Sequence, residues 1–133
     1  MTKPVPTQVH WDREFWNLSA QGILSAQRCR DCGHLQHYPR PACGKCLSSD
    51  RTWQHLSGRG VVYSFTVVRR PFTPGFDSEA PFVLLDVQLE EGIRMLSRLA
   101  DESQAPYLAI GDSLEVVFHQ TENELYLPYF GKA

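Results

Sequence analysis

The sequence lacks any apolar run approaching the roughly 20 residues that a membrane-spanning helix requires. Its first six residues contain no apolar stretch of the kind that forms the core of a signal peptide. It also lacks an excess of basic side chains, since 13 Lys and Arg stand against 15 Asp and Glu for a net charge of −2. We therefore expect a cytoplasmic protein without membrane contact, and the charge balance disfavours a general nucleic-acid binder.

A recognisable catalytic set is also absent from the sequence. The segment Gly58–Gly60 is too short for a phosphate-binding loop, and it precedes a predicted strand instead of a helix. No serine has the context of a nucleophile elbow. The five histidines are scattered, and we interpret His34 and His37, which lie near the cysteines, as surface residues and not as ligands. Whether the chain is an enzyme is left open, and the residues favour a non-catalytic role.

Cysteine is scarce, and its four copies lie close together. They form two Cys-x-x-Cys pairs, Cys29 with Cys32 and Cys43 with Cys46, with ten residues between the pairs. Each pair places two sulfurs on a tight turn, and two such turns can close a tetrahedron around one metal ion. The spacing is shorter than the roughly 15–20 residues common in such sites, yet it leaves room for two short strands. The pattern predicts a zinc ribbon.

Four thiolates complete the shell of a zinc ion, so the predicted Zn²⁺ is structural and keeps no open position for catalysis. Iron in a rubredoxin-like redox centre is an alternative, which Leu47 disfavours because the second cysteine turn would favour glycine there. Two disulfides are a further alternative, which the lack of a secretory signal disfavours.

The chain is expected to divide into a tail and helix (1–22), a zinc ribbon (23–57) and a second domain (58–133). Residues 1–57 carry seven basic and four acidic side chains, a charge of +3, whereas residues 58–133 carry six and eleven, a charge of −5. The ribbon is too small to fold on its core alone, so the metal must supply much of its stability. Residues 1–9 contain two prolines and are predicted to be disordered.

A helix is predicted from about residue 11 to residue 21. Its apolar stripe is formed by Trp11, Phe15 and Leu18, and Gly22 follows as a left-handed terminator. Trp16 lies off that stripe. Such a short helix needs packing partners, so its aromatic face covers either the chain's own ribbon or a partner subunit.

The rest of the pattern predicts a mostly β protein. Strands are expected at 22–28, 34–38 and 51–56 in the ribbon, and at 61–68, 82–89, 93–99, 114–120 and 124–130 in the second domain. A turn at 90–92 and a short helix within 101–110 connect the later strands. Five strands with that helical connection suit an OB-type Greek-key barrel, although a small open sheet or another five-stranded barrel would give the same pattern.

The loop from Arg69 to Pro81 is the strongest candidate for binding a ligand. It joins the first two barrel strands, where OB folds carry a binding loop, and its length is typical of functional loops. Its candidate binding residues are Arg69 and Arg70, which offer charge for phosphate, and Phe72 and Phe76, which offer flat apolar surface. The alternative is a loop packed against the chain's own ribbon.

Several segments in this order resemble a bacterial and archaeal family of small proteins with a rubredoxin-like zinc ribbon followed by an OB fold. That family has long been designated a domain of unknown function and is associated with acyl-CoA metabolism. Besides the cysteine pairs, the segments that carry the resemblance are Phe15-Trp16, Pro39–Pro41, Ser57–Thr66, Pro81-Phe82, Glu91-Gly92 and Gly111–Val116. The resemblance covers roughly residues 11–130.

The resemblance implies an accessory subunit in lipid or steroid metabolism that works beside a thiolase-like, aldolase or hydratase partner. Such a hetero-oligomer would form through the N-terminal helix and the OB-fold surface, and the OB part would help to hold the CoA moiety of an acyl-CoA ligand. The alternative functions are a single-stranded nucleic-acid-binding module, which the charge of the second domain disfavours, and an electron carrier.

Overall fold

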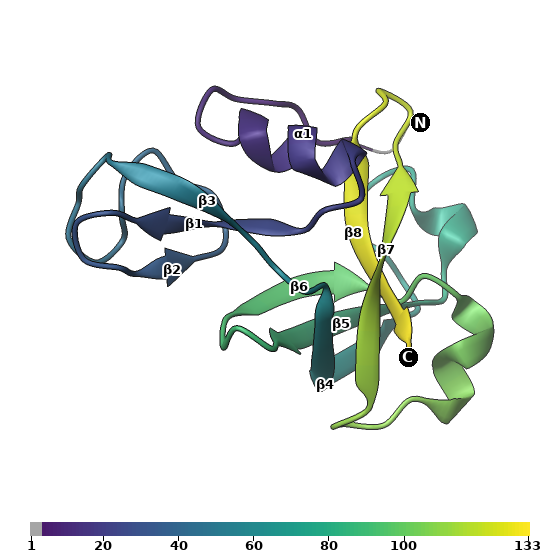
Figure 1. The fold of residues 1–133 in the computed structure, drawn as a ribbon. Helices are drawn as coiled ribbons and strands as arrows, with labels where there is room; N and C mark the ends of the chain where they lie inside the picture. The colour runs from purple at the N-terminus through teal and green to yellow at the C-terminus, as the bar shows by residue number, and fades with distance from the viewer. Residues whose placement is uncertain (1–3) are drawn as a thin grey trace.

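A computed structural model of the chain describes residues 4–133, which form two antiparallel sheets and one α-helix (Figure 1). Helix α1 spans Arg13–Ala20. Gly22 terminates the helix as predicted: it lies two residues after Ala20 with a positive φ of 80°, and the Ile23 N–H turns back to the Leu18 carbonyl at 2.9 Å. None of the helices among the described residues is long and apolar enough to cross a membrane.

The burial of Trp16 is not what the helical spacing indicates. This residue lies off the stripe expected from helical spacing, yet it is only 8% exposed and is buried with Phe15 and Leu18. The reason is that α1 contacts two other elements, strand β1 of the ribbon and strand β8 of the barrel, and two contact surfaces require a wider apolar face than one. The aromatic side chains of the helix are therefore covered within the chain.

The smaller sheet is the ribbon, with strand order β2-β1-β3. Its strands are β1 (Ser25–Cys29), β2 (Leu35–Gln36) and β3 (Arg51–His55). Each is present where the sequence predicted it, but β2 is only two residues long because the chain leaves it toward the second cysteine pair.

The larger sheet is a nearly closed five-stranded barrel, as predicted for an OB-type fold. Its strands, in the order β6-β5-β4-β7-β8, are β4 (Arg59–Val68), β5 (Phe82–Leu89), β6 (Arg94–Arg98), β7 (Ser113–Gln120) and β8 (Tyr126–Lys132). The two outer strands approach each other through a parallel bridge between Leu99 and Phe130 and a 2.6 Å hydrogen bond from Ser97 Oγ to the Pro128 carbonyl. The connection between β6 and β7 contains the 3₁₀ helix η2 (Glu102–Tyr107), where the sequence predicted a short helix.

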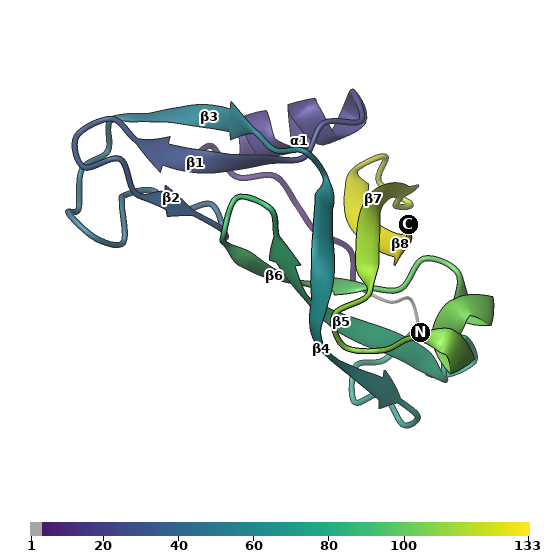
Figure 2. The same ribbon diagram turned by 60° about the horizontal axis from the view of Figure 1, so that its bottom comes forward.

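One apolar core joins the helix to the barrel. It contains Phe15, Trp16 and Leu24 together with barrel residues such as Leu85 and Phe130. The chain segments before and after the ribbon are thus packed with the barrel, and the ribbon projects to one side (Figures 1 and 2).

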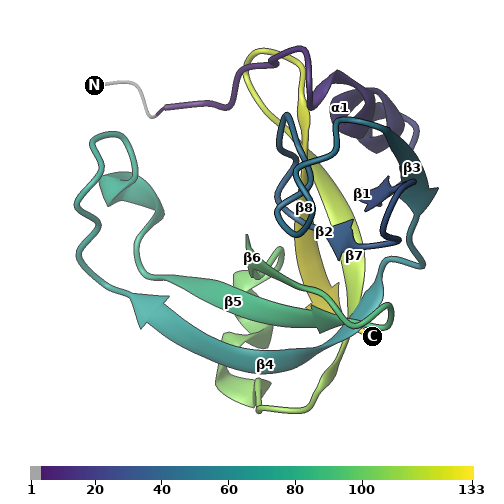
Figure 3. The same ribbon diagram turned by 90° about the vertical axis from the view of Figure 1, so that its left-hand side faces the viewer.

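Strand β4 is longer than its barrel pairing requires. It pairs with β7 only over Arg59–Val61, and after a bulge between Val62 and Ser64 it continues to Val68 beside β5 alone. We call residues 63–86 the β4–β5 arm; it comprises these strand ends, the loop 69–81 and the 3₁₀ helix η1 (Asp77–Glu79). Figure 3 shows the arm extending away from the ribbon and α1. Most of the loop therefore lies away from the ribbon, and its Phe76 lines the cavity that the barrel forms with the ribbon.

Candidate metal centre and interdomain cavity

The four cysteines lie on two turns of the same construction. In the first turn the Gly33 N–H donates to the Cys29 carbonyl at 3.0 Å, and in the second the Leu47 N–H donates to the Cys43 carbonyl at 2.9 Å. Gly33 and Leu47 both have positive φ angles, 76° and 68°. The sequence had identified this conformational demand at position 47, and the second turn meets it with a leucine.

The sulfurs meet the requirements of a tetrahedral metal site. Cys29 Sγ lies 3.5 Å from Cys46 Sγ, and Cys32 Sγ lies 3.6 Å from Cys43 Sγ. All four sulfur atoms lie within 4.8 Å of one another. Zinc–sulfur bonds of about 2.3 Å in a tetrahedron would separate the sulfurs by about 3.8 Å, so the cluster fits one Zn²⁺ with small adjustments. The four-cysteine ribbon thus supports a structural zinc ion.

The turns also favour the thiolate form, which binds metal, at the first cysteine of each pair. The backbone N–H of Cys46, followed by that of Lys45, lowers the pKa of the Cys43 thiol to about 6 despite its burial. The pKa of Cys29 is lowered as well, chiefly by the backbone N–H of Cys32. Because thiolate is the metal-binding form of cysteine, the turn geometry prepares both buried cysteines for coordination.

A buried glutamine that sequence reasoning missed ties the ribbon to the helix. Gln27, in the middle of β1, is only 1% exposed. Its side chain donates to the carbonyls of Trp11 and Arg40 at 3.2 and 2.9 Å, and it accepts from the Arg40 N–H and from Gln36 Nε2. Gln36 in turn accepts from the Gly44 N–H of the second cysteine turn at 2.9 Å. Nothing in the sequence distinguishes Gln27 from an exposed strand glutamine.

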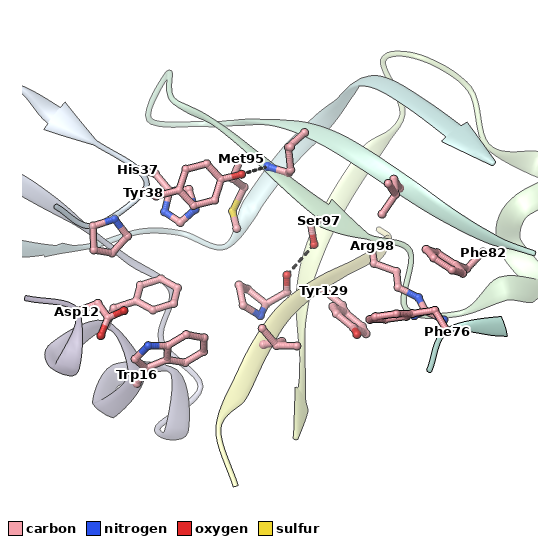
Figure 4. A pocket seen from close by; sticks show the side chains of 16 residues that line it. Asp12, Trp16, His37, Tyr38, Phe76, Phe82, Met95, Ser97, Arg98 and Tyr129 are labelled. Carbon is pink, nitrogen blue, oxygen red and sulfur yellow. Dashed lines mark hydrogen bonds between the residues drawn. The ribbon is translucent and has the colours of Figure 1, made fainter. Parts of the chain in front are cut away.

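A cavity of about 510 Å³ lies between the ribbon and the barrel (Figure 4). Its walls come from α1, the segment His37–Pro39 after β2, strands β6 and β8, and the two phenylalanines Phe76 and Phe82. The Tyr38 hydroxyl accepts a 3.0 Å hydrogen bond from the Leu96 N–H and so joins the ribbon to the edge strand of the barrel. The volume is within the range of roughly 300–1,000 Å³ that is usual for small-molecule sites.

The charged side chains at the cavity wall already have hydrogen-bond partners within the chain. Arg98 donates to Glu79 Oε1 at 2.6 Å and to Glu102 Oε1 at 3.4 Å, and its guanidinium lies 4.3 Å from the centre of the Phe82 ring. Asp12 accepts from the Val9 N–H at 2.9 Å. His37 was expected on the surface, but it lines the cavity, and burial lowers its pKa to about 4. The cavity is thus an apolar site at neutral pH.

The structure separates the four loop residues that the sequence grouped together. Arg69, Arg70 and Phe72 are exposed on the arm, and Phe72 is fully exposed. Phe76 instead is half-buried, lies 6.1 Å from Phe82 between ring centres and lines the cavity. Among residues 4–133, neither Arg69 nor Arg70 forms an ion pair.

Comparison with known proteins agrees with this architecture. Residues 16–51 match the rubredoxin-like zinc ribbon domain of ChsH2, and residues 53–119 match the C-terminal OB-fold domain of ChsH2. The chain is 32% identical over 125 residues to a DUF35 domain-containing scaffold protein of Methanothermobacter thermautotrophicus, a match that covers 93% of this chain and 87% of that protein. The chain belongs to the DUF35 family. The predicted resemblance is thereby confirmed.

Two further relatives of this DUF35 chain carry the names of enzymes. It is 35% identical over 132 residues to a protein of Thermomonospora curvata named "Probable enoyl-CoA hydratase alpha subunit". That match covers 98% of this chain but only 40% of the longer protein. The solved structure "Ltp2-ChsH2(DUF35) aldolase" superposes with a TM-score of 0.82 at 31% identity, covering 96% of this chain and 98% of that one.

Proposed function

We propose that this DUF35 chain is a non-catalytic, zinc-binding accessory subunit of an acyl-CoA-processing complex. A thiolase-like, aldolase or hydratase partner would carry out the chemistry, while this chain helps to assemble the complex and to hold the CoA moiety. The names of the relatives support this assignment. A zinc ion with four thiolate ligands also has no open position for a substrate, which suits a structural role for the metal.

The observation that carries the proposal is the apolar surface of the β4–β5 arm. Its side chains Tyr63, Phe65, Val67 and Phe72 are all exposed, and Phe65 and Val67 share one face of the strand pair. Leu84 is also exposed but pairs with Thr66, so it lies on the opposite face, where it lines the cavity. In addition, β4 beyond its bulge pairs on one side only, so one edge from Ser64 to Val68 is open. An exposed apolar patch beside a free strand edge is typical of a surface that another polypeptide covers.

The arm suits this role better than the aromatic face of the helix. Phe15, Trp16 and Leu18 are buried within the chain, and the exposed positions of α1 are mostly polar, including Arg13, Glu14 and Asn17. In the proposed interface the OB-fold arm supplies the apolar contacts, and the helix contributes only polar contacts at the rim.

The proposed contact with CoA also involves the arm. Arg69 and Arg70 are exposed and offer fixed positive charge to phosphate oxygens, for which arginine has a suitable geometry. The exposed ring of Phe72 offers a face on which an adenine can stack. This is a contact for the polar end of CoA, at the surface where the partner is expected.

Purification of the tagged chain from its native host tests the assignment. We expect a thiolase-, aldolase- or hydratase-type subunit to co-purify, and to be lost with the double variant Phe65→Ser, Phe72→Ser. The control Tyr107→Ser removes an exposed aromatic ring outside the arm and should retain the partner. A clean monomer that recruits no partner and binds no CoA would contradict the proposal.

The CoA contact is tested separately by calorimetry with CoA. The variant Arg69→Ala, Arg70→Ala should weaken binding by about tenfold or more, because each lost charged hydrogen bond is worth roughly 1.5–3 kcal/mol. The control Arg13→Ala, Lys45→Ala removes two exposed basic groups elsewhere and should leave the affinity unchanged. Salt-dependent binding of single-stranded oligonucleotides through the same two arginines would instead support the nucleic-acid alternative.

A further inference from the structure

The interdomain cavity has no role in the contacts proposed so far. Of the four loop residues assigned to CoA, only Phe76 lines it. Six aromatic side chains contribute to its wall: Phe15, Trp16, Tyr38, Phe76, Phe82 and Tyr129. Five separate parts of the chain build it, and the hydrogen bond between Tyr38 and Leu96 joins its two sides. It is a formed cavity and not an open face of one element (Figure 4).

The charged side chains that line the cavity disfavour the binding of a ligand that carries phosphate. Among residues 4–133, the basic side chain in the wall that is charged at neutral pH is Arg98, whose guanidinium already binds Glu79 and Glu102. Asp12 contributes a carboxylate, which would repel an anion. A nucleotide placed here would lose its hydration without gaining a free cation, at a cost of several kcal/mol. A neutral, apolar occupant has no such cost.

Two residues of the wall, Trp16 and His37, have side-chain nitrogens without a hydrogen-bond partner among residues 4–133, and the buried Trp16 Nε1 is one of these atoms. Within residues 4–133 the imidazole of His37 makes ring contacts with Phe15 and Tyr38 but no hydrogen bond. Because burial keeps this imidazole neutral, it carries a single N–H, which can donate to one ligand oxygen. Figure 4 shows the imidazole among the side chains that line the cavity. An apolar ligand with one suitably placed carbonyl would satisfy it.

The loop connects this cavity to the exposed arginines. Phe76 lines the cavity, and Arg69, Arg70 and Phe72 precede it on the same loop. A ligand with an apolar end and a phosphate-bearing end fits this arrangement. Its apolar end would lie in the cavity, and its phosphates would lie beside the exposed arginines. We infer that the cavity binds the acyl group of an acyl thioester, specifically a bulky, ring-bearing acyl group, with His37 donating to one of its oxygens. This inference rests on the proposed function and adds the class of acyl group.

The cavity is tested with methyl 2-naphthoate, a neutral ring-bearing ester without CoA, by a saturation-transfer NMR titration of the full chain. We expect saturable binding. Leu96→Glu, which places a carboxylate at the cavity wall, should weaken it by roughly tenfold or more, because the apolar contact is lost. The matched control is Ile110→Glu, since Ile110 is 69% exposed, Leu96 is 67% exposed, and only Leu96 lines the cavity. His37→Phe keeps a ring but removes the donor and should also weaken binding.

Titrations with 2-naphthoyl-CoA, acetyl-CoA and CoA separate this inference from the proposed function. We expect 2-naphthoyl-CoA to bind about tenfold more tightly than acetyl-CoA, with the difference lost in Leu96→Glu. Equal affinity for all three, with no binding of the ester, overturns the inference and leaves the CoA contact intact. Binding of the ester without any binding of CoA supports the cavity and contradicts the CoA contact. Failure of the ester to compete with 2-naphthoyl-CoA also overturns the inference.

Discussion

Leu47 and Gly33 occupy equivalent positions in the two cysteine turns, and both have left-handed backbone conformations. Glycine adopts this conformation without strain, whereas a side chain with a Cβ carries a cost of roughly 1–2 kcal/mol. The leucine side chain is 79% exposed, so little packing offsets that cost. The second turn is therefore the strained half of the metal site.

We predict that Leu47→Gly stabilises the zinc-bound chain by about 1 kcal/mol, because it removes the left-handed strain. Thermal unfolding of the zinc-bound protein and competition with a metal chelator measure the effect. Leu47→Ala is the matched control, since it removes the exposed side chain but keeps the Cβ, and it should leave stability nearly unchanged. Equal stabilisation by both variants would show that the side chain, and not the backbone, is responsible.

His37 gives the chain a pH dependence of predictable sign. Burial lowers its pKa to about 4 in the folded chain, from an ordinary value of 6.5. Between these values the unfolded chain binds the proton more readily, so folding stability falls as pH falls from about 6.5 toward 4. The other charged groups that line the same cavity are Asp12 and Arg98.

We predict that wild type loses about 2 kcal/mol more stability than His37→Phe between pH 7 and pH 5. Urea unfolding at both pH values measures this difference. Zinc release at low pH affects both proteins, so their comparison isolates the imidazole. Identical pH slopes would indicate that His37 titrates normally in the folded chain.

At the scale of the elements, strand β4 belongs first to the barrel and then to the β4–β5 arm. Its first residues lie between β5 and β7 in the barrel, and its last residues form one side of the arm. Gly60 lies in the barrel part, where a Cβ would approach the Gln88 carbonyl oxygen to 2.5 Å. The close approach of β4 and β5 at this point leaves room only for glycine.

We predict that Gly60→Ala destabilises the chain by roughly 1–3 kcal/mol, because backbone must move to relieve the contact. Gly131→Ala in β8 is the control, since a Cβ there meets nothing closer than 3.6 Å. It should be neutral, or slightly stabilising through the less flexible unfolded chain. Urea unfolding compares the two, and similar effects from both would contradict the close-packing argument.

For the whole molecule, the decisive feature is that the helix shares its core with the barrel while the ribbon projects from it. Phe15, Trp16 and Leu24 belong to the barrel's core. We propose that the chain has two folding units, a metal-dependent ribbon and a barrel that includes α1. In that division the predicted segment 1–22 belongs with 58–133, and only the inner part of 23–57 depends on zinc.

We predict that removing zinc, or the substitution Cys43→Ser, unfolds the ribbon and leaves α1 and the barrel folded. The metal supplies much of the ribbon's stability, whereas the helix packs on β8 and places Phe15 and Trp16 in the barrel core. Hydrogen–deuterium exchange should show lost protection between the cysteine pairs and retained protection in β4–β8. Native-like protection of the ribbon in the metal-free chain, or loss of protection throughout, would contradict this.

The features that the sequence alone determined are local ones. The cysteine pairs predict the metal site because a few adjacent residues fix each turn, and Gly22 ends the helix through its own backbone conformation. The barrel strands follow from period-two alternation, which depends only on neighbours along the chain. Even β5 was predicted with its observed bounds, Phe82–Leu89.

Only the tertiary structure decided which side chains meet across long separations. The burial of Trp16, the place of His37 in the cavity wall, the hydrogen bonds of Gln27 and the open edge of β4 each depend on where another element packs. The cavity is the clearest case, because residues from 12 to 129 form its wall and no stretch of sequence contains them together. The cavity forms through the packing of segments that are distant in sequence, whereas the conformation of each cysteine turn is determined by residues adjacent in sequence.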